Sequence, residues 1–528
     1  MRAVERNIDL DDRSRSPTAP SGKIYLVGAG PGDRKLITVK GKECLQTADV
    51  VVYDRLVNPQ LLSYCPARTE HVYVGKRVGS SENQQAEINQ LLIQRAQKGQ
   101  IVVRLKGGDP LIFGRGGEEV MAIAEAGVTF EIVPGITAGL AVPAYAGIPV
   151  THRDSASSVL FVTGHSANQS NIDWEKVATG VDTIVVFMGV RSLPTVVEKL
   201  LMHGRSPSTP VAVIQFGTTS QQRTVVGKLS DIRQKAKDCQ PPAVTVFGEV
   251  VELRQYCQWF DQKPLFGRTI LITRPVTQTD QITSLLEGNG AEVISFPTVE
   301  IVPIHPNTDL ELAIQQLSRY NWIIFTSSNA VEIFTQALRN QGFDCRALAF
   351  TKVCAVGEKT AQILESYGIV ADFIPTKSTG EVIGRELPRV KKQQILLPRS
   401  KIGRREIFDQ LQQRGAIIKD LPIYETVRPD HAGRIDQIRV IQKRLANGEI
   451  DMAIFTSPST LNNFLTQKCY VDDFNPVESL TKMAATAIGQ TTKAYAAEND
   501  IHIDLVPDSP SMENLAESVV DFFHKTKG

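Results

Sequence analysis

The sequence has no excess of charge of either sign. Its 528 residues include 58 Lys and Arg against 57 Asp and Glu, for a net charge of +1. A nucleic-acid-binding protein usually carries a basic face, so this balance argues against that class. Apolar runs are also short, and none approaches the length of a membrane-spanning helix. We therefore expect neither nucleic acid nor membrane among the partners.

Cysteine is sparse, and no CxxC pair or Cys/His cluster occurs. The seven cysteines lie far apart, at Cys44, Cys65, Cys239, Cys257, Cys345, Cys354 and Cys469. This pattern indicates reduced thiols in a cytoplasmic protein, with no disulfide frame and no metal site. Residues 1–21 lack the apolar core of a signal peptide, and we expect them to form a disordered tail.

What the sequence does contain is a regular alternation of predicted strands and helices, typical of an α/β protein with three or four domains. The central stretch is residues 102–119. A buried strand over 101–105, interrupted only by Arg104, runs into the break Gly107, Gly108, Asp109, Pro110, and a helix follows over 117–126. Such a break either presents main-chain groups to a ligand or makes a tight structural turn. It is not a phosphate-binding loop, because no Gly-Lys-Ser/Thr follows.

Other strand ends point to the same edge of a sheet. The stretch 23–33 (KIYLVGAGPGD) ends in glycines, but its third glycine is misplaced for a dinucleotide fingerprint. The next strand ends on Asp54 and Arg55, which either face a ligand crevice or form a surface ion pair. A short strand at 72–74 delivers Lys76 and Arg77 to this edge.

A second α/β unit follows the sharp turn at Gly135. Thr137 and Ala138 open a helix, and four strands are expected before residue 253. We place two lobes at about 22–133 and 134–255, and a linker at 256–266, where the halves should separate.

The remaining sequence repeats itself at a spacing of about 130 residues, which indicates two related α/β domains. NWIIFTSSNAVEIF at 321–334 matches DMAIFTSPSTLNNF at 451–464, and 355–375 matches 487–507. FPTVEIV at 296–302 and LPIYETV at 421–427 would cross together between the domains. We expect domain one at 267–296 plus 428–525, with domain two, 302–420, inserted in it. Ser327 and Ser457 then cap helices or bind carboxylates.

The N-terminal half, 22–255, resembles uroporphyrinogen-III C-methyltransferase. The resemblance rests on LVGAGPGD, ADVVVYDRLV, VGKR, RLKGGDPLIFGRGGEE, VPGITA, AYAGIPVTHRD and FVTGH. It implies a two-lobed fold that transfers two methyl groups from S-adenosyl-L-methionine to give precorrin-2. The implied cofactor contacts are Pro31, Gly107, Gly108, Asp109, Ile112, Thr137, Ala138, Met188 and Gly217. It also implies a homodimer formed through this half.

The same resemblance suggests roles for charged residues. Asp54 is the candidate general base, and Lys76 matches a proposed proton donor. The substrate is rich in carboxylates, and candidate partners for them are Arg55, Arg77, Arg104, Arg115 and Arg153. Arg104 is also a candidate catalytic residue, because it interrupts an apolar strand. Family members often carry histidine where this chain has Ser81, so no histidine role is expected there.

The C-terminal half, 267–525, resembles uroporphyrinogen-III synthase through TRP at 273–275, FTSSNAV, AVGEKTA, PIYET, FTSPST and AIGQTT. The resemblance implies closure of hydroxymethylbilane with inversion of ring D and no cofactor. Tyr424 matches the candidate acid. Candidate substrate contacts are Arg274, Ser327, Ser457, Thr491 and Thr492.

Two alternatives stay open. The synthase-like half is either catalytic or a binding module that serves the methyltransferase half. A methyltransferase acting later in corrin synthesis is disfavoured by the fused synthase. No NAD-binding domain precedes Lys23, so oxidation of precorrin-2 and iron insertion are not expected.

Overall fold

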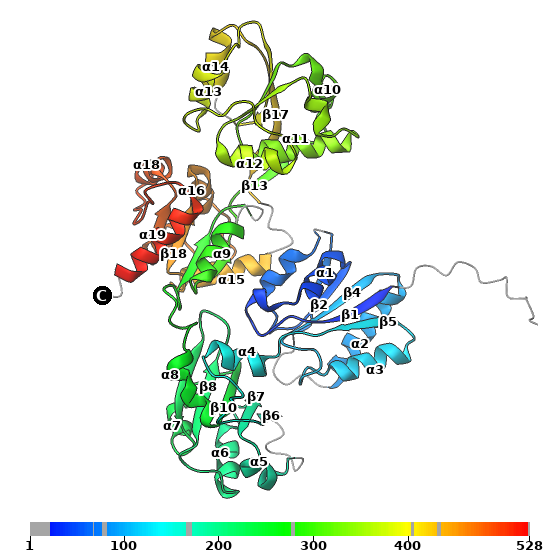
Figure 1. Ribbon diagram of the computed structural model, residues 1–528, viewed down its shortest axis with the longest axis vertical. Helices are drawn as coiled ribbons and strands as arrows, with labels where there is room; N and C mark the ends of the chain where they lie inside the picture. The colour runs from blue at the N-terminus through cyan, green and yellow to red at the C-terminus, as the bar shows by residue number, and fades with distance from the viewer. Residues whose placement is uncertain are drawn as a thin grey trace, which may run out of the picture. The chain divides into compact units, whose positions relative to one another are not determined.

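The computed structural model describes residues 22–66, 68–75, 82–164, 172–275, 280–402, 406–429 and 435–525. The chain forms two compact units, the first of residues 1–268 and 288–292 and the second of the rest. In both units helices cover β-sheets, as Figure 1 shows. None of the helices in the described ranges is long and apolar enough to cross a membrane.

The first sheet has the strand order β3-β2-β4-β1-β5, and all neighbouring strands are parallel. Its lobe comprises β1 (Lys23–Gly28), α1 (Val39–Thr47), β2 (Val50–Tyr53), β3 (Glu70–Tyr73), α2 (Glu82–Gln97), β4 (Ile101–Lys106), α3 (Gly116–Glu125) and β5 (Thr129–Val133). Helix α1 covers one face of this sheet, and α2 and α3 cover the other (Figure 1).

The pleat of β4 decides which of its side chains meets which helix. Successive side chains of a strand point to opposite faces. Val103 and Leu105 pack in the core on the α1 side, whereas Val102 packs on the side of α2 and α3. Arg104 and Lys106 share the face of Val102. Because all five strands are parallel, the loops after β1, β2, β4 and β5 meet at one edge of the sheet.

The second sheet is mixed, with the order β6-β7-β10-β8-β9. Its lobe comprises α4 (Ala138–Tyr145), β6 (Val159–Thr163), α5 (Trp174–Gly180), β7 (Thr183–Phe187), α6 (Leu193–Met202), β8 (Pro210–Gln215), β9 (Arg223–Lys228), α7 (Ile232–Lys235), β10 (Ala243–Phe247) and α8 (Arg254–Cys257). Strand β10 is antiparallel to both β7 and β8, so these two strands end at the same edge.

Strand β9 differs from the sequence expectation of four strands in this lobe. It pairs antiparallel with β8 at the edge of the sheet. Three of its six residues are exposed. An edge strand that buries so little has a weak hydrophobic pattern, which is why the sequence did not show it.

The predicted linker, 256–266, packs on helix α4. The rings of Trp259 and Phe260 lie 5.0 and 4.7 Å from the ring of Tyr145. Trp259 Nε1 donates to the carbonyl of Ala144 at 3.0 Å. Arg254 donates to the carbonyl of Ala146 and pairs with Asp261. A cut that separates the halves without exposing this cluster would therefore fall after residue 266.

The second unit also contains two sheets. One has the order β12-β11-β18-β19, and its part of the chain comprises β11 (Thr269–Ile272), α9 (Asp280–Gly288), β12 (Glu292–Ser295), α15 (Ile435–Ala446), β18 (Met452–Phe455), α16 (Pro458–Leu465), α17 (Pro476–Thr481), β19 (Ala484–Ala487), α18 (Gln490–Glu498) and α19 (Met512–Lys525). The other has the order β13-β17-β16-β14-β15, and its part comprises β13 (Glu300–Pro303), α10 (Thr308–Gln315), β14 (Trp322–Phe325), α11 (Ser328–Asn340), β15 (Lys352–Ala355), α12 (Glu358–Ser366), α13 (Gly380–Glu386), β16 (Gln394–Ser400), α14 (Glu406–Gln413) and β17 (Ile417–Val427). The two stretches predicted to cross together between the domains, 296–302 and 421–427, contribute to β13 and β17, which pair antiparallel.

The sequence repeat corresponds to a repeat of local structure. Ser327 and Ser457 cap α11 and α16 with nearly the same backbone angles, φ −162° and −161°. Asp372 and Asp504 each accept a hydrogen bond from a backbone N–H 19 residues earlier, at 2.7 and 2.8 Å. In each repeat a strand is thus followed by a helix whose N-terminus is capped by a serine side chain.

Candidate functional site

Asp54 follows β2 directly and lies at the edge where the parallel strands end. Arg104 Nη2 donates to Asp54 Oδ1 at 2.7 Å, and Lys106 Nζ lies 4.0 Å from Oδ2. The Asp54 side chain is 31% exposed, so solvent or a ligand still reaches it. Its partner is thus Arg104 on the neighbouring strand, whereas the adjacent Arg55 is exposed.

Arg104 is buried, with a side chain only 2% exposed. Its Nη1 donates to the carbonyls of Val52 and Leu105 at 3.3 and 3.4 Å, and its Nε donates to Glu119 Oε1 at 3.1 Å. These bonds direct the guanidinium into the protein. In this geometry Arg104 holds Asp54, and its predicted role in substrate binding or catalysis stays a prediction.

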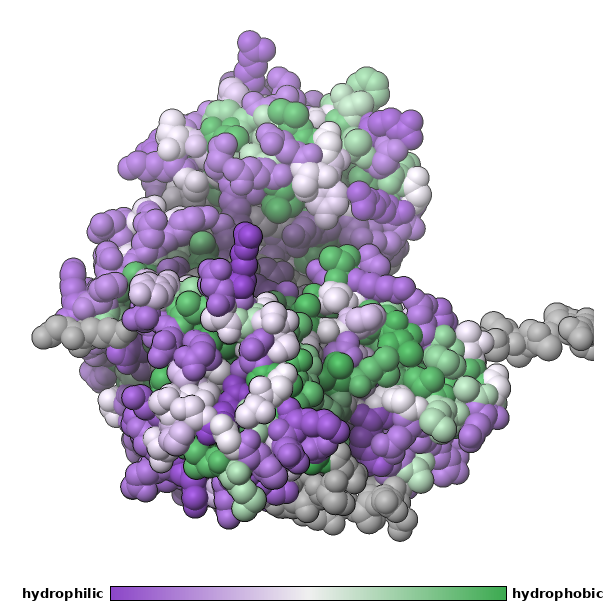
Figure 2. Space-filling view, turned by 60° about the horizontal axis from the view of Figure 1, so that its bottom comes forward, coloured by the Kyte–Doolittle hydropathy of each residue, from purple (hydrophilic) through white to green (hydrophobic). Residues whose placement is uncertain are grey.

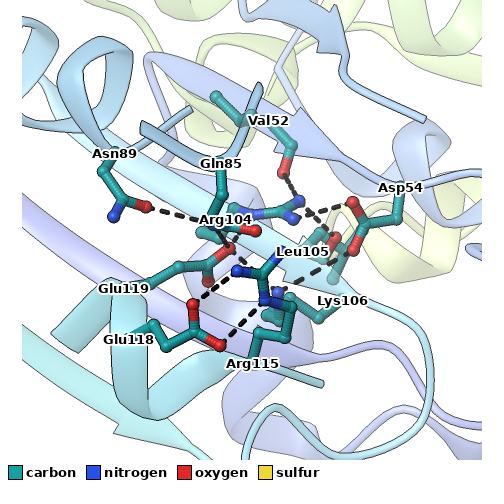
Figure 3. A network of polar contacts seen from close by, with 10 residues as sticks. All are labelled: Val52, Asp54, Gln85, Asn89, Arg104, Leu105, Lys106, Arg115, Glu118 and Glu119. Carbon is teal, nitrogen blue, oxygen red and sulfur yellow. Dashed lines mark hydrogen bonds and ion pairs between the residues drawn. The ribbon is translucent and has the colours of Figure 1, made fainter. Parts of the chain in front are cut away.

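Lys106 and Glu119 complete this cluster and were missed in the sequence. Lys106 Nζ donates to Glu119 Oε1 at 3.0 Å, and Gln85 Nε2 donates to the same oxygen at 3.1 Å. Figure 3 shows these side chains converging from α2, β4 and α3. Two patterns could have found them: Lys106 alternates with Arg104 along β4, and Glu119 shares the buried stripe of α3 with Gly116 and Ile123.

The glycine loops after β1 and β4 bind one another. Gly108 N donates to the carbonyl of Gly30 at 2.7 Å, and Gly30 N donates back at 3.2 Å. A side chain at Gly28 or Gly135 would collide with neighbouring backbone, so three loops meet here main chain to main chain. Asp109 accepts from Leu111 N at 2.9 Å and from Gly135 N at 3.0 Å. This favours the structural-turn alternative for Asp109, and its ligand role stays a prediction.

Helix α4 connects several predicted cofactor residues. A Cβ on Gly108 would lie 3.7 Å from Ala138 N and 3.9 Å from the Cα of Thr137, the N-cap of α4. A Cβ on Gly217 would lie 2.4 Å from Val142 in the same helix. The structure thus brings Gly108, Thr137, Ala138 and Gly217 to one helix.

Backbone strain gathers in the loops beside α4. Among the described residues other than glycine, eight have positive φ, and five of these follow β4, β7 or β8: Phe113, Arg115, Met188, Phe216 and Thr218. Such conformations cost about 1–3 kcal/mol each and concentrate at functional sites. Met188 combines this strain with a 49% exposed apolar side chain. A methionine that packs in the core would be buried, so its exposure and backbone strain set Met188 apart from a core residue.

Further apolar side chains stand exposed near these strand ends. Ile112 is 39% exposed, and Ile136 and Leu140 are 40% and 47% exposed. Figure 2 shows hydrophobic side chains gathered in places on a mostly hydrophilic surface. Pro31 is half-buried in the loop after β1. The next glycine, Gly32, lies against Thr218, so this loop reaches the second lobe.

The loop after β1 is also held from the second lobe. Tyr145, the last residue of α4, donates its hydroxyl to Asp33 Oδ2 at 2.8 Å. Burial raises the pKa of the Tyr145 phenol, and the Asp33 carboxylate acts in the same direction. Thr218 Oγ1 accepts from Asp33 N at 3.1 Å. Tyr145 and Asp33 were not among the predicted site residues.

The remaining predicted cations differ in their surroundings. Arg115 is exposed and pairs with Glu118 at 2.6 Å. Arg55 and Arg153 are exposed. Lys76, Arg77 and Ser81 lie outside the described residues, so their predicted roles stay predictions.

In the second unit two predicted residues come together. The Tyr424 hydroxyl lies 3.0 Å from Ser327 Oγ, and Ser327 accepts from Ala330 N at 3.1 Å. Tyr424 is 6% exposed, with its ring in the core of its domain. The Tyr424 hydroxyl therefore sits at the N-terminus of α11, where backbone N–H groups favour negative charge.

The other predicted synthase residues are more scattered. Ser457 caps α16 in a capping box with Thr460. Thr491 is exposed at the start of α18, whereas Thr492 beside it is 2% exposed and faces the interior. Arg274 Nη1 lies 3.1 Å from the sulfur of Met512, and burial lowers the pKa of this guanidinium.

Comparison with known proteins covers both halves. Residues 23–233 match the family of Tetrapyrrole (Corrin/Porphyrin) Methylases, and residues 280–517 match the family of Uroporphyrinogen-III synthase HemD. The porphyrin biosynthesis protein HemD of Ruminiclostridium josui is 35% identical over 95% of this chain and 98% of that protein. The chain belongs to this family of fused methylase–synthases.

Other relatives are named as uroporphyrinogen-III methyltransferases. The uroporphyrinogen-III C-methyltransferase of Bacillus subtilis is 41% identical over 69% of this chain and 75% of that protein. The S-adenosyl-L-methionine-dependent uroporphyrinogen III methyltransferase of Methanosarcina barkeri is 51% identical over 44% of this chain and 93% of that protein. A solved uroporphyrin-III C-methyl transferase of Thermus thermophilus, complexed with S-adenyl homocysteine, is 41% identical over 44% of this chain and 100% of that chain, with a TM-score of 0.39.

The fused methylase–synthase is an enzyme of porphyrin biosynthesis with a methyltransferase half and a synthase half. Its methylase match includes every predicted methyltransferase residue. Its synthase match includes Ser327, Tyr424, Ser457 and the two threonines of α18, and begins after Arg274.

Proposed function

We propose that the chain closes hydroxymethylbilane to uroporphyrinogen III with inversion of ring D, and then methylates this product twice to give precorrin-2. The observation that carries the proposal is the match over 98% of the HemD relative, which spans both halves. One chain would then both make uroporphyrinogen III and consume it.

The residues around α4 fit S-adenosyl-L-methionine, on which the M. barkeri relative depends. Among the described residues, a Cβ at Gly108 would meet Ala138 and Thr137 alone, both at ordinary contact distance, so this glycine offers an open main-chain face. We propose that Pro31, Gly107, Gly108, Asp109, Ile112, Thr137, Ala138, Met188 and Gly217 hold the cofactor there. Bound at this place, the cofactor would supply the methyl group.

Asp54 is the proposed general base of the methyltransferase half. A pyrrole carbon that gains a methyl group becomes cationic, and a proton must then leave. Arg104 fixes the Asp54 carboxylate by a 2.7 Å hydrogen bond, and the Asp54 side chain stays partly exposed. A carboxylate held in this way can accept a proton without rearranging. The exposed Arg55, Arg115 and Arg153, together with Lys76 and Arg77, are the proposed partners of the substrate carboxylates.

In the synthase half we propose that Tyr424 helps the hydroxyl group of hydroxymethylbilane to leave. Ser327 lies 3.0 Å from its hydroxyl and orients it. Ser457, Thr491, Thr492 and Arg274 are proposed to bind substrate carboxylates. Of these four residues, Thr492 has the least support for carboxylate binding, because its side chain is buried.

The test supplies hydroxymethylbilane to the full chain with and without S-adenosyl-L-methionine, and identifies the products by mass and isomer. We expect uroporphyrinogen III without the cofactor and a doubly methylated product with it. Formation of the type I isomer alone would refute the synthase activity and favour a binding module. Accumulation of unmethylated uroporphyrinogen III in the presence of the cofactor would refute the methyltransferase activity.

The family resemblance also supports a homodimer formed through the methyltransferase half. Light scattering of the full chain and of residues 1–268 measures this. Both the full chain and the fragment 1–268 are expected to be dimers. A monomeric fragment would mean that the methyltransferase half does not form the dimer.

A further inference from the structure

Two buried cations lie on one side of Asp54. Arg104 Nη2 is 2.7 Å from one oxygen of Asp54, and Lys106 Nζ is 4.0 Å from the other. Both side chains are at most 5% exposed, so water screens their charges poorly. Left unopposed, these cations would set two uncompensated positive charges against the carboxylate that is proposed as the base.

Glu119 is the group that opposes them. It is 0% exposed, and its Oε1 receives the hydrogen bonds of Arg104 Nε, Lys106 Nζ and Gln85 Nε2. Burial alone would raise the pKa of Glu119, but Arg104 and Lys106 together hold it below its ordinary value. Burial lowers the pKa of Lys106, and the Arg104 charge acts in the same direction. Glu119 therefore carries its negative charge inside the protein.

The cluster also has a defined geometry. Glu119 Oε1 binds the Nε side of the Arg104 guanidinium, which turns Nη2 toward Asp54 (Figure 3). Because the guanidinium is planar and rigid, fixing Nε fixes the direction of Nη2. Glu119 thus acts on both the position and the charge of Asp54, which it does not touch.

We propose that Glu119 is a positioning residue for methylation: through Arg104 and Lys106 it orients the Asp54 carboxylate and preserves its basicity. The inference rests on the proposed role of Asp54 as general base. Other charged groups around Asp54 are the exposed Arg55, which follows it, and the Arg115–Glu118 pair at the start of α3. Lys76 and Arg77 follow β3 and lie outside the described residues.

Glu119→Gln removes the charge with little change of shape. Among the described residues, Glu119 Oε2 is buried without a hydrogen-bond partner. The amide nitrogen of Gln can take that place while its oxygen keeps the three donors now on Oε1. Glu119→Asp keeps the charge with a shorter reach and is the conservative variant.

The first experiment titrates Asp54 in the full chain, using ¹³C-labelled aspartate carboxylates and Asp54→Asn to assign the signal. Glu119→Gln should lower the midpoint of Asp54, because two cations are then unopposed. Lys106→Met should raise it, because one cation is gone. Shifts of roughly half a pH unit or more are expected from charges this close. Glu119→Asp keeps the negative charge, so its Asp54 midpoint should stay close to that of the wild type.

Exposed Glu118, one residue away, supplies the control. Its charge is screened by water, so Glu118→Gln should leave the Asp54 midpoint in place. The inference is overturned if Glu119→Gln and Lys106→Met shift the midpoint in the same direction, or if neither moves it. A shift in Glu118→Gln as large as that in Glu119→Gln would equally overturn it.

The second experiment measures single-turnover methylation against pH. In Glu119→Gln the acid limb should move to lower pH and the plateau rate should fall, while the affinity for S-adenosyl-L-methionine stays within a few-fold of wild type. If the wild-type chain does not methylate uroporphyrinogen III, the proposed function fails, and the titration still decides the coupling. If it methylates and the acid limb of Glu119→Gln is unmoved, the positioning role fails alone.

Discussion

At the scale of single residues, Asp54 tests the chemistry most directly. Asp54→Asn keeps the shape of the side chain and removes the base, and loss of a general base typically costs about 10²–10⁴ in rate. Affinity for S-adenosyl-L-methionine should barely change, because the proposed cofactor contacts lie in other loops. Single-turnover methylation and a separate binding titration measure the two quantities.

The control for Asp54→Asn is Asp238→Asn, an exposed aspartate of the same half. It should leave the methylation rate unchanged. If Asp54 only pairs with Arg104, its loss should leave the buried Arg104 guanidinium without this partner and lower the stability of the lobe. A methylation rate within a few-fold of wild type would leave Asp54 with that structural role.

Gly108 tests the cofactor loop. Gly108 has φ +70°, and asparagine tolerates this conformation better than other side chains. Gly108→Asn should therefore fold, while its side chain occupies the open space beside Thr137 and Ala138. We expect the affinity for S-adenosyl-L-methionine to fall at least about tenfold, which corresponds to about 1.4 kcal/mol. Isothermal calorimetry measures the change.

Gly127→Asn is the matched control for this substitution. Gly127 has φ +67° and open space around it, in the exposed turn after α3. Both variants carry the same backbone strain, so a difference in cofactor affinity reports the position and not the strain. Equal affinities in the two variants would remove Gly108 from the cofactor site.

The residue scale also shows how far the sequence reaches. Asp54 was found because a charged residue at the end of an apolar strand stands out. Arg104 was noticed for interrupting a strand, but its partners Asp54 and Glu119 come from other parts of the chain, so its buried role needed the fold. Lys106 and Glu119 needed the pleat of β4 and the stripe of α3 to be read together.

At the scale of elements, α4 organises the methyltransferase half. Its first turn lies beside Gly108, its Gly139 lies against Phe187 next to Met188, and its last residue binds Asp33. The segment after α8 packs on this same last residue, Tyr145, through Trp259 and Phe260. The position of α4, and with it the loops of the proposed cofactor site, therefore depends on residues beyond 256.

A pair of truncations tests this dependence. Residues 1–268 retain Phe260, 6% exposed, and Leu265, 0% exposed, whereas residues 1–258 lose both. Removing a buried aromatic ring alone costs about 3–5 kcal/mol. We expect 1–258 to melt roughly 6–20 °C below 1–268, since 1 kcal/mol shifts the melting temperature by about 2–4 °C in a domain of this size.

Calorimetric scans of both fragments give the melting temperatures, and cofactor binding to each gives the functional effect. The shorter fragment should also bind S-adenosyl-L-methionine more weakly, because Tyr145 loses its aromatic neighbours. Equal melting temperatures would mean that the cluster around Trp259 adds no stability to the methyltransferase half.

Polar composition explains why the sequence did not show the packing of residues 256–266. The stretch 256–266 reads as a linker because Gln, Lys and Pro are frequent in it, yet its aromatic residues pack on α4. Strand β9 was missed for the opposite reason, because an edge strand buries too few side chains to show a period. Long, buried elements such as β4 and α3 were found to within a residue or two, since their hydrophobic patterns are strong.

At the scale of the whole molecule, the predicted sites fall into two separate compact units. Every predicted methyltransferase residue lies in the first unit, and every predicted synthase residue lies in the second. The repeat within the second unit, visible in the sequence, reappears in the matching caps Ser327 and Ser457. The sequence repeat does not say which of the two serine caps lies beside Tyr424. The structure shows that β17 brings Tyr424 to Ser327.

This separation predicts that the two activities can be removed one at a time. Tyr424→Phe keeps the ring in its core and removes the hydroxyl that lies 3.0 Å from Ser327 Oγ. If this hydroxyl acts as the acid, ring closure should slow by about 10²–10⁴, while methylation of supplied uroporphyrinogen III stays normal. Gly108→Asn should do the reverse. Tyr320→Phe, which alters a partly buried tyrosine of the same core, should affect neither. If Tyr424→Phe slows both reactions, the loss reflects general damage. If it slows neither, the acid must be sought among the other hydroxyl groups of the second unit.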